Sequence, residues 1–143
     1  MDRSTLIVKR SGIVNRQLVK EGIRGTTFVA ENSLLPFTLA RFYIIYDVSD
    51  FNIERGGHAH KRNEQALFVL KGSCEIMLDD GEGRQTVRLT DTEPGIRLGS
   101  GLWHTMSSFS KDCILAVAAS ENYDRGDYIT DYNEFLEYAR SIQ

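Results

Sequence analysis

The chain has 143 residues, of which 41% are hydrophobic and 26% are charged, and its formal net charge is −3. These values are typical of a globular protein, and they argue against nucleic acid or an anionic membrane as a partner, because both need a basic surface. No apolar run is long enough to cross a bilayer, and the N-terminus lacks the apolar segment of a signal peptide. We therefore expect a cytoplasmic protein with a single domain over residues 1–143.

Short segments rich in β-branched and aromatic residues follow one another along most of the chain, separated by clusters of Gly, Asp and Asn. An apolar run at 5–8 is a further candidate strand near the N-terminus. The other predicted strands are 26–30, 39–47, 57–60, 66–70, 73–78, 85–89, 96–98, 103–107 and 113–119. Many short strands with close turns favour an all-β sandwich or closed barrel.

The hydrophobic period changes near the C-terminus. Tyr132, Phe135 and Ala139 recur at helical spacing, and Asp131 is followed three residues later by Glu134, as in a capping box. We expect one short amphipathic helix there, with its aromatic face packed on the barrel or in a dimer contact.

The two cysteines lie in strand-like apolar stretches without the spacing of a metal site. We therefore expect Cys74 and Cys113 to be buried free thiols.

Two of the three histidines in the chain, His58 and His60, are separated by one residue. In a strand, such residues point to the same face, so their imidazoles lie side by side. Imidazole has a pKa near neutrality, which suits both proton transfer and metal binding. A solvent-facing pair is the alternative, but Gly56 and the cations around the pair favour a site. His104, which follows Gly101-Leu102-Trp103, is the third histidine.

A His-x-His pair with a later Gly-x-x-His is the skeleton of the two cupin motifs. Metal-binding cupins carry a carboxylate that is separated by six residues from the glycine that corresponds to Gly72, and this chain has Gln65 at that position. Glu64 is adjacent, but a shift of one residue points a strand side chain to the opposite face. We therefore predict a barrel with no metal and no other cofactor. The rival hypothesis is a metal-dependent cupin enzyme that recruits Glu64.

The chain resembles the dTDP-4-keto-6-deoxyglucose 3,4-ketoisomerases, the small WxcM-like sugar-nucleotide cupins. The segment Arg55-Gly-Gly-His-Ala-His-Lys61 is the most diagnostic part of the resemblance, although Gly57 replaces an aromatic residue that is common in relatives. The other matching segments are 24–26, 35–37, 41–43, 72–74, 78–81, 101–104 and 127–129. Residues before Arg24 match poorly. A non-catalytic sugar-binding cupin is a further alternative.

The resemblance implies a cupin (jelly-roll) barrel that binds a dTDP-linked 4-keto-6-deoxy sugar. The enzyme would move the keto group from C4 to C3 through an enediol, in deoxyaminosugar and surface-polysaccharide biosynthesis. It also implies a homodimer, with N-terminal strands exchanged between the subunits. The configuration of the product at C4 and the nucleotide carrier stay open.

The resemblance also implies roles for individual residues. His60 would be the principal base, His58 would assist it, and Tyr43 would be a hydroxyl donor or relay. The predicted substrate-binding residues are Arg41, Arg55, Lys61, Gln65, Trp103 and His104. For Tyr43 an outward position on its strand is the alternative, and for Trp103 the alternative is a place in the core.

Overall fold

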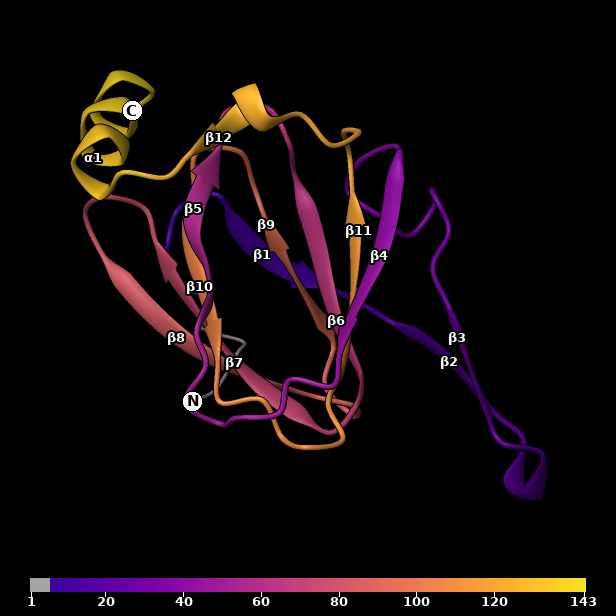
Figure 1. The fold of residues 1–143 in the computed structure, drawn as a ribbon. Coiled ribbons are helices and arrows are strands. Elements are labelled where there is room, and N and C mark those ends of the chain that lie inside the picture. The colour runs from indigo at the N-terminus through magenta and orange to yellow at the C-terminus, as the bar shows by residue number, and fades with distance from the viewer. Residues whose placement is uncertain (1–5) are drawn as a thin grey trace.

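The computed structural model describes residues 6–143, in which two five-stranded sheets face each other across an apolar core (Figure 1). One sheet has the order β1-β9-β6-β11-β4 and the other β12-β5-β10-β7-β8, while β2 and β3 form a separate hairpin. The strands are β1 (Ser11–Val14), β2 (Gln17–Lys20), β3 (Thr26–Val29), β4 (Arg41–Tyr46), β5 (Arg55–His60), β6 (Gln65–Lys71), β7 (Ser73–Asp79), β8 (Arg84–Thr90), β9 (Gly95–Leu98), β10 (Trp103–Ser107), β11 (Ile114–Ala119) and β12 (Tyr128–Ile129). The remaining elements are α1 (Tyr132–Ser141) and the 3₁₀ turns η2 (Gly22–Arg24) and η3 (Arg125–Asp127).

The burial of the strands follows from what covers each face. β8 has an alternating pattern, in which Gln85, Val87 and Leu89 are buried between exposed neighbours, as expected for a sheet with one solvated face. β6 and β11 are buried almost continuously, because Phe28 and Phe37 pack on their outer face. The all-β prediction is therefore confirmed, and Cys74 and Cys113 are buried free thiols as expected.

The prediction of a strand at 5–8 is wrong for the residues that the structure describes, and residue 5 lies outside them. The backbone amide of Ile7 donates to the Gln85 side chain at 3.1 Å, and that of Lys9 donates to the Asp80 carboxylate at 2.8 Å. The backbone amides of Ile7 and Lys9 are thus bonded to side chains, whereas in a strand they could bond to the backbone of a neighbouring strand. Among residues 6–143 the first strands are β1 and β2, which the sequence pattern did not indicate.

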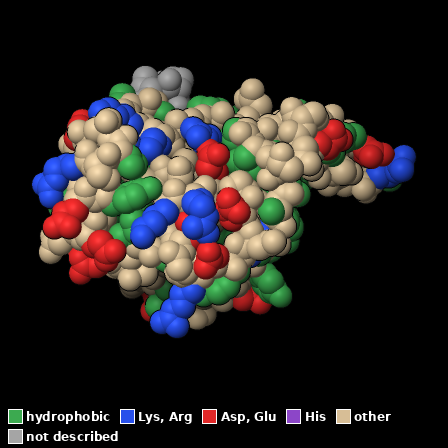
Figure 2. Space-filling model, turned by 90° about the horizontal axis from the view of Figure 1, so that it is seen from above, with side chains coloured by type: hydrophobic (Ala, Val, Ile, Leu, Met, Phe, Trp, Pro, Cys, Tyr) green, Lys and Arg blue, Asp and Glu red, His purple; other side chains and the backbone are tan. Residues whose placement is uncertain are grey.

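The β2–β3 hairpin projects from the body of the molecule and carries η2 at its tip (Figures 1 and 2). Ile23, at this tip, is fully exposed at 107%, and Val19 on β2 is 41% exposed. An isolated two-stranded hairpin is marginally stable in water. The projection therefore leaves apolar surface without cover in this chain.

The predicted C-terminal helix is confirmed as α1. The Asp131 side chain caps it by accepting a hydrogen bond from the Glu134 backbone amide at 2.9 Å. Its buried residue Phe135 packs in a cluster with Ala59 of β5 and Ile129 of β12. The helix thus supports the end of the strand that carries the histidine pair. Among the described residues, no helix is long and apolar enough to span a membrane.

Candidate active site

The three histidines lie close together on two neighbouring strands of the second sheet. β5 carries His58 and His60, and β10 pairs with β5 so that His104 lies opposite His58. The ring centroid of His58 is 4.9 Å from that of His60 and 4.8 Å from that of His104. Gly56 allows this approach, because its φ is 82° and a side-chain carbon there would lie 2.9 Å from the His104 carbonyl oxygen. The sequence spacing thus leads to one cluster of imidazoles.

A cavity of about 180 Å³ opens beside this cluster. It is lined by Arg41, Tyr43, Ile45, Arg55, Gly56, His58, Met106 and Tyr128. Four of the residues predicted to form the site therefore share its wall, namely Arg41, Tyr43, Arg55 and His58. A larger cavity of about 360 Å³ lies beside the β2–β3 hairpin and contains none of them. Chemistry at the histidines thus belongs to the smaller cavity.

The histidines differ in their access to this cavity. His58 is half-buried and lines it, whereas His60 is 4% exposed and His104 is 1% exposed. Burial, and to a smaller extent the neighbouring imidazoles, lower the pKa of His60 to about 4 despite the opposing effect of Asp127, and they lower the pKa of His104 to about 3. Burial also lowers the pKa of His58. All three imidazoles are therefore neutral at pH 7 and able to accept a proton.

Tyr43 is held between a cation and an amide. Gln65 Nε2 donates a hydrogen bond to Tyr43 Oη at 2.9 Å, and the Arg41 guanidinium lies 4.6 Å from the centroid of the tyrosine ring. Burial raises the pKa of the Tyr43 hydroxyl despite the opposing effect of Arg41. The hydroxyl thus keeps its proton at pH 7, and its oxygen already accepts from Gln65, so the proton is free to be donated.

Several predicted substrate contacts lie away from the cavity. Trp103 lies in the core, which was the alternative to substrate binding for this residue. Its ring packs there against Tyr132 and Phe135. The side chain of Lys61 is exposed, and its backbone amide donates to Asp127 O at 3.0 Å. Gln65 and His104 are buried behind the residues that line the cavity. Strand periodicity does not predict how deeply these side chains are buried, because it assigns a side chain to one face of the sheet and says nothing of its distance from solvent.

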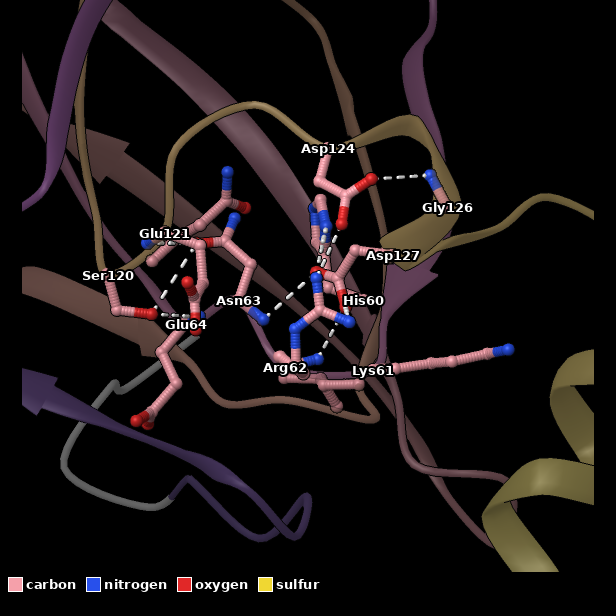
Figure 3. Close-up of polar contacts among 12 residues, drawn as sticks. His60, Lys61, Arg62, Asn63, Glu64, Ser120, Glu121, Asp124, Gly126 and Asp127 are labelled. Carbon is pink, nitrogen blue, oxygen red and sulfur yellow. Dashed lines mark hydrogen bonds and ion pairs between the residues drawn. The ribbon is translucent and has the colours of Figure 1, made fainter.

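Two neighbours of the cluster were not assigned a role from the sequence. The Tyr128 ring centroid is 4.4 Å from that of His60 and 4.8 Å from that of His58, and the tyrosine lines the cavity. The Asp127 carboxylate lies beside His60, with its Oδ2 3.6 Å from His60 Nδ1 (Figure 3). The only signal for them was their place in the segment 127–129, which shares the family resemblance.

The donor set of the cluster bears on the metal hypothesis. Nitrogen atoms of the three histidines lie within 4.8 Å of one another, a spacing that a metal ion could use. However, Glu64 forms an ion pair with Arg97, and the neutral Gln65 bonds Tyr43. Neither Glu64 nor Gln65 thus offers the cluster a free anionic ligand of the kind that strengthens divalent sites. The Asp127 carboxylate beside His60 accepts hydrogen bonds from two backbone amides.

We expect turnover to continue after exhaustive chelation, with well under one equivalent of transition metal in the purified protein. Elemental analysis beside an activity assay measures both. A Gln65→Glu variant, which adds the missing carboxylate, should retain more metal and serves as the positive control. Activity that disappears with a chelator and returns with a divalent ion would contradict the prediction.

A protein family and a curated relative match nearly the whole of this chain. Residues 11–140 match the family FdtA, described as WxcM-like, C-terminal. The TDP-4-oxo-6-deoxy-α-D-glucose-3,4-oxoisomerase of Aneurinibacillus thermoaerophilus is 38% identical over 130 residues, which cover 91% of this chain and 93% of that protein. These likenesses extend over nearly the whole of both chains.

Solved structures agree with this relationship. A 3,4-ketoisomerase from Helicobacter canadensis is 37% identical with a TM-score of 0.84, over 91% of this chain and 97% of that one. A mutant of the 3,4-ketoisomerase QdtA from Thermoanaerobacterium thermosaccharolyticum, crystallised with TDP-4-keto-6-deoxyglucose, is 30% identical with a TM-score of 0.88, over 94% and 97% of the two chains. The predicted cupin barrel is confirmed, and the chain belongs to the FdtA family of WxcM-like proteins.

Proposed function

We propose that this protein is a sugar-nucleotide 3,4-ketoisomerase that converts TDP-4-keto-6-deoxyglucose into the corresponding 3-keto sugar. The observation that carries the proposal is a neutral histidine, His58, in the wall of a cavity that also presents the Tyr43 hydroxyl and two guanidinium groups. The Aneurinibacillus thermoaerophilus relative is named as an oxoisomerase of this sugar nucleotide, and the QdtA mutant was crystallised with it.

The reaction is an isomerisation, in which protons change position within the sugar. It needs no external oxidant or reductant. The ketone at C4 acidifies the proton on C3, a base removes that proton, and an enediol(ate) forms. The oxygen on C4 takes up a proton in the enediol. A proton is then delivered to carbon C4, while the oxygen on C3 loses its proton and becomes the ketone. The site must therefore supply a base, a proton donor and partners for the developing oxyanion.

His58 is the group that we assign to contact the substrate as the base. It lines the cavity, whereas His60, the principal base expected from the sequence, lies behind it and is 4% exposed. The two ring centroids are 4.9 Å apart. We therefore assign His60 to a relay that exchanges the proton with His58.

Tyr43 and the arginines complete the assignment. The Tyr43 hydroxyl, whose oxygen accepts from Gln65, is assigned to donate a proton to the oxygen on C4 as the enediol forms. Arg41 and Arg55 line the same cavity. A single guanidinium group can bind two phosphate oxygens at once. They are the assigned ligands of the diphosphate. A cytoplasmic location and a role in surface-polysaccharide synthesis stay predictions.

Incubation with TDP-4-keto-6-deoxyglucose, followed by NMR, tests the proposal. We expect a new ketone carbon at C3 and a new proton at C4, whose couplings give the configuration at C4. Unchanged substrate, or a sugar altered only by epimerisation at C3 or C5, would contradict it.

We also expect a homodimer in which the partner subunit covers the β2–β3 hairpin. On β4, an edge strand, Phe42 is 50%, Ile44 is 41% and Tyr46 is 63% exposed, so an apolar stripe faces outward. The fully exposed Ile23 at the tip of the hairpin also lacks cover within the chain. A partner subunit that receives the hairpin would bury both surfaces.

Light scattering at micromolar concentration should give twice the monomer mass of 16.2 kDa. An Ile23→Asp variant places a charge at the tip of the hairpin and should weaken the dimer, whereas Ile142→Asp, at the far end of the chain, should not. A monomer mass for the unaltered protein would show that this prediction is wrong.

A further inference from the structure

Asp127 lies buried beside the histidine cluster, at 3% exposure. Its Oδ1 accepts a hydrogen bond from the backbone amide of Arg62 at 2.7 Å, and its Oδ2 accepts from that of Asn63 at 3.0 Å. The same Oδ2 is 3.6 Å from His60 Nδ1, longer than a hydrogen bond but within ion-pair distance (Figure 3). A buried carboxylate thus faces one nitrogen of a buried imidazole.

The chain holds this carboxylate in place from two directions. The backbone carbonyl of Asp127 accepts from the Lys61 amide at 3.0 Å, immediately after β5. The next residues enter β12, in which Tyr128 pairs with His60 and Ile129 with Ala59 of β5. The position of Asp127 relative to His60 is therefore set by backbone contacts on both sides and does not depend on a flexible side chain.

A neutral imidazole carries its proton on one ring nitrogen, and the hydrogen-bond partner decides which. A carboxylate opposite Nδ1 favours the proton there and leaves the lone pair on Nε2. Within the described residues, both ring nitrogens of His60 are buried without a hydrogen-bond partner, and the Asp127 carboxylate approaches Nδ1 at 3.6 Å, not Nε2. Nε2 is thus available to a proton that arrives from the neighbouring cluster.

We propose that Asp127 is a positioning residue that holds His60 in its Nδ1–H tautomer, so that Nε2 can take up the proton that His58 removes from the substrate. When His60 receives that proton, the carboxylate faces the imidazolium and stabilises it, and the proton returns by the same route when C4 is protonated. This role rests on the proposed ketoisomerase function and adds a residue to it.

The tautomer can be tested in the unaltered protein without substrate. The chain has three histidines, so ¹⁵N labelling of histidine gives a simple spectrum, and the His60→Asn variant assigns the signals of His60. We expect a protonated Nδ1 and an unprotonated Nε2 at pH 7. The opposite tautomer would overturn the proposal, whatever reaction the protein catalyses.

Kinetics of Asp127→Asn test the consequence. We expect kcat to fall at least about tenfold, within the range of an acid–base contribution, while KM changes less than about threefold. In a His60→Asn background, Asp127→Asn should cause no further loss, because it acts through the residue already removed. Unchanged kcat, or losses that multiply in the double variant, would overturn the proposal.

Asp124→Asn is the matched control on the same turn. Asp124 pairs with the Arg62 side chain at 2.6 Å and accepts from Gly126 N at 2.9 Å, without contact to His60. It should leave kcat near that of the unaltered enzyme, and an equal loss in both variants would assign Asp127 a purely structural role. If the unaltered protein fails to convert the sugar nucleotide, the proposed function fails, while the tautomer measurement still decides the placement of Asp127.

Discussion

Replacing His58 by Asn should lower kcat by about 10²- to 10⁴-fold, the usual contribution of a general base. The reason is that His58 is the one histidine in the wall of the cavity that holds Tyr43, Arg41 and Arg55. Asn keeps a polar side chain of similar size but cannot accept the C3 proton. Turnover of TDP-4-keto-6-deoxyglucose, followed by NMR, measures the loss.

His60→Asn provides the comparison. The buried imidazole has no place in the cavity wall, so its loss should reduce kcat less than the loss of His58. Circular dichroism and TDP titration should show that both variants fold and bind the nucleotide, because the assigned diphosphate ligands are arginines. A larger loss in His60→Asn would restore the order of roles expected from the sequence.

Acidification should destabilise the fold well above the pH at which carboxylates titrate. The folded-state pKa is about 4 for His60 and about 3 for His104, whereas an unfolded histidine has a pKa near 6.5. Above pH 6.5 both states are neutral, so stability does not change. Below it only the unfolded chain takes up protons, and each histidine lowers the free energy of unfolding by about 1.4 kcal/mol per pH unit down to its folded-state pKa.

Urea unfolding at pH 7, 6 and 5 measures this dependence. A His104→Gln variant removes one of the two buried titrating groups, and its free energy of unfolding should change with pH by a smaller amount than that of the unaltered protein. The comparison concerns the slope and not the absolute stability, which the substitution itself will alter. A free energy of unfolding that is the same at pH 7 and pH 5 would rule out neutral buried histidines.

Local spacing in the sequence was enough to predict the type of fold and to place the histidine pair on one face of a strand. Alternation along β8 and the helical period from Tyr132 are consequences of backbone geometry, so the all-β fold with one C-terminal helix was correctly predicted. The pair His58 and His60 shares a strand face for the same reason. The neutral Gln65 at the carboxylate position is equally visible in the sequence.

The tertiary structure alone decided how deep each residue lies and what it meets. His58 and His60 point to one face, but only the pairing of β5 with β10 and β12 leaves the first beside the cavity and buries the second. The same pairing brings Asp127 to a residue 67 positions earlier in the chain, and packing of α1 places Trp103 in the core. Strand periodicity determines the direction of a side chain, whereas burial and long-range contacts depend on which other strands fold over it.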